Sequence, residues 1–199
     1  MRYYLILLAV SLVFPIAELI IGKMLARSSL VLLDGLHALA HGAFFYFAFQ
    51  VSKQVHEEFL SIFEEERRRK LYAAVQSAFL VGGMTLFLVL HVFGKISEPE
   101  EQNVFFTIVG AGVGLAGALL SVLILREFKK TRETNLTYNV VEIHVHADIW
   151  TSLVPIAAAP FIWAGNYLLI PGIVYLDPLL TTAIAIWFIA KSLPYLMPS

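Results

Sequence analysis

Residues 104–125 read VFFTIVGAGVGLAGALLSVLIL, a stretch of 22 residues without Asp, Glu, Lys or Arg. About 20 helical residues are enough to cross the hydrocarbon core of a bilayer. Backbone groups cannot stay unpaired in lipid, so an apolar segment of this length is expected to cross as a helix. Gly110 and Gly114 form a GxxxG pattern, which lets another helix approach closely and which we interpret as packing inside a bundle.

Five further apolar stretches are long enough to cross a membrane. The chain has 199 residues, of which 59% are hydrophobic and 15% charged, and its mean hydropathy is +0.77. The sequence therefore predicts an all-α membrane protein, a six-transmembrane-helix bundle that forms a single transmembrane domain over residues 1–199. The expected spans are residues 3–22, 30–50, 71–93, 104–125, 140–163 and 175–196.

The composition excludes several classes of function. The formal net charge is −1, so no excess of positive charge indicates a nucleic-acid partner. The chain contains no Cys, which excludes disulfides, thiolate metal sites and thiol catalysis. A metal site in this protein must therefore use nitrogen and oxygen ligands.

The distribution of Lys and Arg predicts the orientation of the helices. With six spans, the N-terminus and the loops at residues 51–70 and 126–139 lie on one side and carry ten Lys and Arg residues, whereas the opposite loops carry three. Loops rich in Lys and Arg stay in the cytoplasm. We therefore expect a multi-pass protein of the cell (inner) membrane with both termini in the cytoplasm.

Ionisable side chains inside the spans cluster in two of the six. An Asp at the centre of a membrane helix costs roughly 2.5 to 3.5 kcal/mol on insertion scales, so such residues usually face protein or water and mark function. The second span contains Asp34, His37 and His41, and the fifth contains Glu142, His144, His146 and Asp148. Glu18 and Asp177 lie apart from these groups, and we interpret both as structural residues that bond to backbone or to neighbouring helices.

The spacing of these residues predicts a joint site. Positions i and i+4 share one helix face, so His37 and His41 project together, as do His144 and Asp148. Because the two helices are expected to run antiparallel, His37 should lie level with Asp148, and His41 with His144. Either pair alone is as often a packing feature as a metal site, but two facing pairs favour metal binding.

Three imidazoles and one carboxylate form a plausible tetrahedral shell for Zn²⁺ and contain too much nitrogen for Mg²⁺ or Ca²⁺. Alternatives for the ion are Cd²⁺, Co²⁺, Fe²⁺ and Mn²⁺. Asp34 could orient a ligand or relay a proton. Glu142 and His146 are further candidates for such roles, although His146 points about 160° away from Asp148 around the helix.

Three blocks of the sequence resemble the transmembrane domain of the cation diffusion facilitator family. The run FPIAELIIGKMLARSSLVLLDGLHALAHG, from Phe14, is similar to the family's F-x-x-x-E-x-x-x-G segment and its D-x-x-H-x-x-x-D box. The run HVHAD, from His144, resembles the second HxxxD pair, and YLDPLLTTAIAIWFIAKSLPYL, from Tyr175, resembles the start of the family's sixth helix. The resemblance implies a six-helix metal exporter that exchanges its ion for protons, with metal ligands at His37, His41, His144 and Asp148.

The chain departs from the family pattern in two places. The usual second ligand is Asp, but here it is His41, which removes one negative charge from the site. The chain also stops at Ser199, directly after the sixth span, where typical members continue into a soluble domain that dimerises. We therefore expect a transmembrane domain without a C-terminal cytoplasmic domain. A homodimer is one possible oligomeric state.

The sequence thus predicts efflux of a divalent transition metal, with zinc as the first choice, by proton-coupled antiport, and no enzymatic activity. The expected partners are the metal ion, protons and the lipid bilayer. One alternative is an intramembrane histidine-ligated metalloenzyme, a lipid hydroxylase or hydrolase, which six His residues and the lack of an HExxH motif make a weak fit. Another is a metal-binding subunit that does not transport.

Overall fold

The computed structural model describes residues 2–58, 62–98, 100–130 and 136–196. Its helices are α1 (Arg2–Ile20), α2 (Ser29–Glu58), α3 (Ile62–Phe87), α4 (Phe93–Ser97), α5 (Val104–Lys130), α6 (Leu136–Tyr167) and α7 (Leu176–Ser192). A π-helical turn, Ile21–Ala26, extends α1, and a second one, Leu88–Val92, joins α3 to α4 into one long segment. The described residues thus form six long helical segments and no strand, which confirms the predicted all-α fold.

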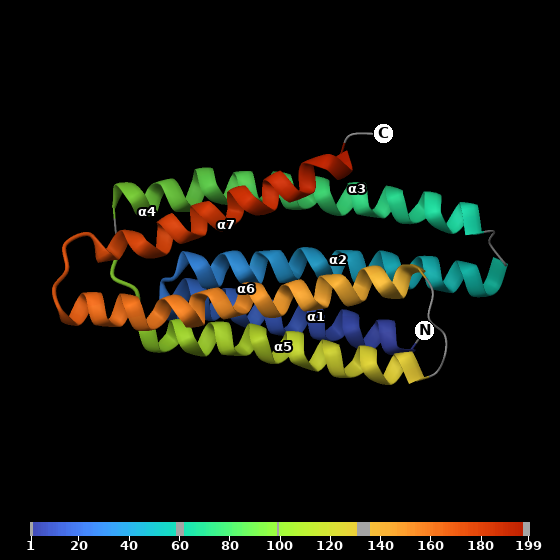
Figure 1. Cartoon of the computed structure of the whole chain (residues 1–199), viewed down its shortest axis with the longest axis horizontal. Helices are drawn as coiled ribbons and strands as arrows, with labels where there is room; N and C mark the ends of the chain where they lie inside the picture. Colours follow the sequence, from blue (N-terminus) through green and yellow to red (C-terminus); the bar gives the residue numbers. More distant parts are fainter. Residues whose placement is uncertain (1, 59–61, 99, 131–135, 197–199) are drawn as a thin grey trace.

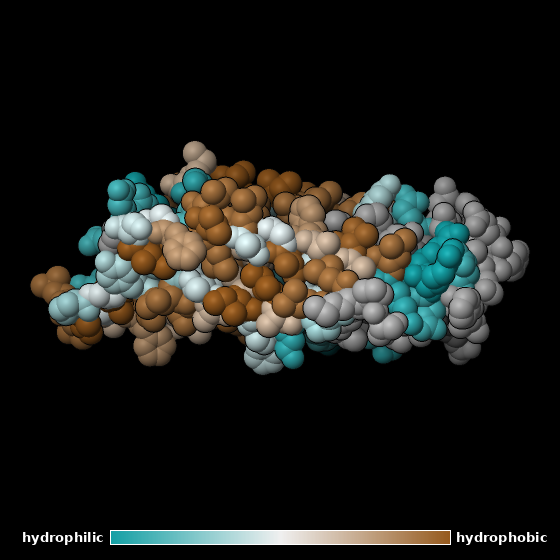
Figure 2. Space-filling model, turned by 90° about the horizontal axis from the view of Figure 1, so that it is seen from above, coloured by the Kyte–Doolittle hydropathy of each residue, from teal (hydrophilic) through white to brown (hydrophobic). Residues whose placement is uncertain are grey.

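Each expected span lies within one of these six segments. Five segments are long and apolar enough to cross a membrane: Leu5–Ala26, Glu66–Ser97, Val104–Glu127, Val145–Tyr167 and Ile173–Ser192. The remaining long helix, α2, is not among these five, and its first half carries Asp34, His37 and His41. Figure 2 shows hydrophobic surface across the middle of one face, with hydrophilic residues toward the ends of the molecule.

The long helices lie side by side along one axis (Figure 1). Helices α1, α2, α5 and α6 form one group, and α3 and α7 pack against each other and against α2. The start of α1 and the end of α7 point toward the end of the bundle at which α2 leads to α3 and α5 leads to α6. This arrangement places the two Lys- and Arg-rich loops at one end.

Small residues of α5 let α1 and α2 approach closely. A Cβ atom added at Gly110 would lie 2.8 Å from Val31 Cγ1, and one at Gly114 would lie 2.7 Å from both carboxylate oxygens of Glu18. Neither glycine could therefore accept a larger side chain without movement of its neighbour. The GxxxG pattern of α5 packs inside the bundle, as predicted from the sequence.

A carboxylate from α7 holds the start of α2. Asp177 Oδ1 accepts hydrogen bonds from the Ser28 hydroxyl at 2.6 Å and from the Leu30 N–H at 3.3 Å, and Oδ2 accepts one from the Ser29 N–H at 2.7 Å. The first N–H groups of a helix have no partner within the helix, and the helix dipole favours negative charge there. Asp177 therefore acts as a cap from another helix, which confirms the structural role predicted for it.

Candidate metal site

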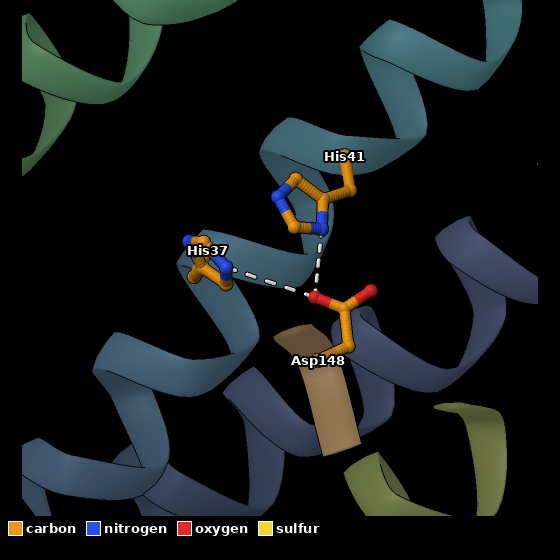
Figure 3. A group of neighbouring side chains, drawn as sticks. All are labelled: His37, His41 and Asp148. Carbon is orange, nitrogen blue, oxygen red and sulfur yellow. Dashed lines mark ion pairs between the residues drawn. The ribbon is translucent and has the colours of Figure 1, made fainter. Parts of the chain in front are cut away.

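Two histidines of α2 and one aspartate of α6 meet in the interior of the bundle. The His41 Nδ1 atom lies 2.7 Å from Asp148 Oδ1, and the His37 Nε2 atom lies 3.7 Å from the same oxygen (Figure 3). Their ligand atoms all lie within 4.8 Å of one another. His37 and His41 are only 3% and 2% exposed. The structure thus brings together three of the four residues expected to bind metal.

The geometry of this cluster is compatible with a small divalent ion. Zinc bound tetrahedrally at 2.0 to 2.1 Å holds neighbouring ligand atoms about 3.3 Å apart. The two measured distances, 2.7 and 3.7 Å, fall on either side of that value. The third distance, between the two imidazole nitrogens, is at most 4.8 Å, so all three ligand atoms lie near the spacing that a zinc ion requires.

The contact between His41 and Asp148 is an ion pair when the imidazole is protonated, because only then does the ring carry a positive charge. A metal ion bound by both atoms would supply positive charge in place of that proton.

Two further carboxyl groups lie close to this cluster. Glu18 is fully buried, Asp34 is 4% exposed, and the largest electrostatic interactions of Glu18 are with Asp34 and Asp148. Buried carboxyl groups in such proximity require protons or a cation to offset their charge. The interior of this bundle is therefore chemically suited to a cation.

A comparison with protein families agrees with this arrangement. The model of the cation efflux transmembrane domain matches residues 4–199, which is nearly the whole chain. The chain belongs to the cation efflux family. Members of this family transport divalent metal cations, so the protein is a cation transporter by family and the metalloenzyme alternative has no support. No curated protein matches the chain at a significant level.

The structure describes the side chains of two of the three other residues of this cation efflux protein that we expected at or near the site. His144 is on α6, but its side chain lies outside the described residues. His146 is exposed, and its ring Nδ1 lies 2.7 Å from the backbone oxygen of Glu142 on its own helix. The structure therefore does not bring His146 to the site. Glu142 is half-buried.

Asp148 contacts both histidines of α2 and not only His37, the one expected beside it. Spacing along the helices placed Asp148 beside His37, but its Oδ1 atom lies closer to His41. The offset between two packed helices depends on their turns and crossing angle, and the sequence pattern does not specify these. Asp148 consequently contacts both histidines.

An aromatic residue of α7 that was not predicted from the sequence contacts the site. The ring of Phe188 stacks on the imidazole of His37, with centroids 3.9 Å apart and planes 17° from parallel. Phe188 is 6% exposed. No spacing rule connects an apolar residue of the last helix with a histidine of the second, so the sequence carried no signal for this contact.

Proposed function

We propose that this protein exports Zn²⁺ from the cytoplasm in exchange for protons. The ion would bind His37, His41 and Asp148, with His144 as the fourth ligand. The observation that supports the proposal is the cluster of two imidazoles and one carboxylate within 4.8 Å of one another, formed by α2 and α6 in the interior of the bundle.

The types of ligand atom favour zinc among divalent ions. Imidazole nitrogen and carboxylate oxygen are common ligands of Zn²⁺, whereas Mg²⁺ and Ca²⁺ prefer sites made entirely of oxygen. Affinity and geometry do not separate zinc strongly from Co²⁺ or Cd²⁺ with such ligands. We therefore expect these two ions to compete with zinc, and Mg²⁺ not to compete.

The imidazole ligands of the cluster support coupling to a proton gradient. Imidazole binds metal only when the coordinating nitrogen has lost its proton. An ion that binds His41 must therefore displace any proton on the coordinating nitrogen, and a returning proton competes with the ion. Asp34 lies close to this pair and is our candidate for relaying the proton.

The direction of transport follows from the expected orientation. An interior pocket beside Asp148 is lined by side chains of α1, α2, α5 and α6 and includes the hydroxyl groups of Ser11 and Ser121. A Cβ atom added at Gly42, next to His41, would lie 3.1 Å from Ser11, so the pocket lies at the level of the site. On the positive-inside rule the end of the bundle with the Lys- and Arg-rich loops is cytoplasmic, and zinc would enter the pocket from that end.

Zinc flux into proteoliposomes tests the proposal. Vesicles with an acidic interior and a trapped zinc indicator should take up Zn²⁺ while their interior becomes more alkaline, and a protonophore should abolish the uptake. His41→Ala and Asp148→Ala should each lower uptake at least tenfold, because each removes a ligand. His146→Ala is the matched control, since His146 lies on α6 but is exposed.

Two results would contradict the proposal. Uptake at the wild-type rate by both His41→Ala and Asp148→Ala would show that the ion binds elsewhere. Stoichiometric zinc binding without any flux would instead favour a metal-binding subunit that does not transport.

A further inference from the structure

The stack between Phe188 and His37 joins the α3 and α7 pair to the metal cluster. Both side chains are almost completely buried, at 6% and 3% exposure. The ring of His41 contacts His37 as well, with centroids 4.2 Å apart and planes at 64°. The His37 ring therefore lies between two other rings: Phe188 of α7 stacks on it, and His41 contacts it edge-on.

These two contacts restrict the rotation of the His37 ring. An imidazole can turn about the bond between Cβ and Cγ, and this rotation moves Nε2 away from any fixed point. The Phe188 ring, stacked with its centroid 3.9 Å from that of the imidazole, favours orientations in which the imidazole plane is nearly parallel to the Phe188 plane. In the observed plane, Nε2 faces Asp148 Oδ1 at 3.7 Å. The stack thus favours the orientation of His37 that metal binding requires.

We propose that Phe188 is a positioning residue of the metal site: its ring holds His37 in the ligand orientation and makes metal affinity depend on where α7 lies. The proposal rests on the proposed function, since it takes His37 as a ligand. Phe188 itself does not touch the ion. A shift of α7 along or away from α2 would remove the ring from His37, free the imidazole to turn and weaken metal binding.

The surroundings of Phe188 separate this role from ordinary packing. Its neighbour Trp187 is 52% exposed and faces outward from the bundle. Another residue of α7, Ala185, packs with Leu33, Ala40, Leu80 and Met84 in an apolar cluster. Phe188 is the residue of α7 whose ring lies on an expected ligand.

Cobalt binding to the full chain in lipid nanodiscs tests the proposal. Co²⁺ occupies zinc sites, and its visible absorption becomes several times more intense when its coordination is tetrahedral. Phe188→Leu conserves an apolar side chain and removes the flat ring, whereas Phe188→Tyr retains the ring. Phe87→Leu is the matched control, because Phe87 packs beside the same apolar cluster and stacks on a histidine, His91, at 5.1 Å, and that histidine is not an expected ligand.

Aromatic stacks typically contribute a factor of two to ten to an equilibrium. We expect Phe188→Leu to weaken Co²⁺ binding by about that factor and to lower the absorption of each bound ion, because His37 no longer stays in place. Phe188→Tyr should restore both values, and Phe87→Leu should leave both unchanged. A purely structural role would lower thermal stability in Phe188→Leu and Phe87→Leu alike without changing the spectrum of bound cobalt.

The outcomes separate this proposal from the proposed function. Unchanged affinity and unchanged absorption in Phe188→Leu, with normal binding by the wild type, would overturn the role of Phe188 alone. Absence of Co²⁺ and Zn²⁺ binding by the wild type would overturn the metal site and this proposal together. If Phe188→Leu does not fold, Phe188→Met, which also lacks a flat ring, is measured in its place with the same expectations.

Discussion

Replacement of Asp177 by Ala should loosen the start of α2, the helix that carries both histidines of the cluster. Asp177 accepts hydrogen bonds from the Ser28 hydroxyl, the Ser29 N–H and the Leu30 N–H at 2.6, 2.7 and 3.3 Å. It is 4% exposed, and Ser28 and Ser29 are fully buried. Water therefore cannot easily replace the carboxylate as an acceptor, and Ala leaves three donors without it.

The expected loss of stability follows from these three bonds. Each net contribution is about 1 kcal/mol, so Asp177→Ala should cost about 3 kcal/mol. For a chain of this length, about 1 kcal/mol lowers the unfolding midpoint by roughly 2 to 4 °C, which gives a decrease of roughly 6 to 12 °C. Asp177→Asn keeps one carbonyl oxygen but loses the charge, so its decrease should be about half as large.

Thermal unfolding of the purified protein in one detergent measures this effect, followed by intrinsic fluorescence or by the appearance of aggregate. Glu98→Ala is the control, because Glu98 is an exposed acidic residue close to the end of α4. A midpoint for Asp177→Ala within about 2 °C of the wild type would refute the reasoning, since three buried donors would then have found other partners. A decrease for Asp177→Asn as large as that for Asp177→Ala would show that the charge matters more than the number of bonds.

Three other predictions follow from the packing, the site and the topology. Gly114→Ala should destabilise the fold, because its Cβ would lie 2.7 Å from the oxygens of Glu18. The control Gly112→Ala meets nothing within 4 Å and should be neutral or stabilising by up to about 1 kcal/mol. Equal unfolding midpoints of the two variants would contradict this prediction. His41→Asp restores the carboxylate typical of the family, so zinc transport should lose part of its dependence on pH between about 6 and 8. Cd²⁺ or Mn²⁺ should also be transported better relative to Zn²⁺. Identical pH profiles and identical metal selectivity in a folded variant would rule this out. Lys129→Cys should react with an impermeant thiol reagent only from the cytoplasm and Glu98→Cys only from the opposite side, and the reverse pattern would overturn the proposed direction of export.

The sequence predicted six helices, and the described residues form six long helical segments, although only five of these are long and apolar enough to cross a membrane. The ends of the helices were less predictable. The expected second and third spans were residues 30–50 and 71–93, but α2 reaches Glu58 and α3 begins at Ile62. The expected spans ended near the first charged residues. A helix can continue beyond the membrane into water when oppositely charged side chains on it form ion pairs. Glu64 pairs with Arg67 at 2.9 Å and Arg68 at 3.2 Å, and their hydrogen bonds lower its pKa.

For the candidate site, the sequence predicted which residues share one face of a helix, but not which residues of different helices meet. Residues four apart share a face, so His37 and His41 were expected together, and they are. Periodicity does not tell which side chain of another helix meets them at which level, and Asp148 lies closer to His41 than expected. It also carries no information about Glu18, which we expected to be structural and which is fully buried among acidic neighbours.

Two contacts connect α7 to α2, the helix that carries both histidines of the metal cluster. Asp177 binds Ser29 at the start of both helices, and eleven residues later Phe188 stacks on His37, which lies eight residues beyond Ser29. At 1.5 Å per residue these contacts are about 16 Å apart along α7 and about 12 Å apart along α2. The hydrogen bonds fix one end, and the ring stack is a contact that a tilt of α7 about that end can break. A tilt of this kind would change the surroundings of His37 without moving Asp148, which belongs to α6. Metal affinity would then respond to α7 through one side chain, and the cobalt spectrum of Phe188→Leu measures that response directly.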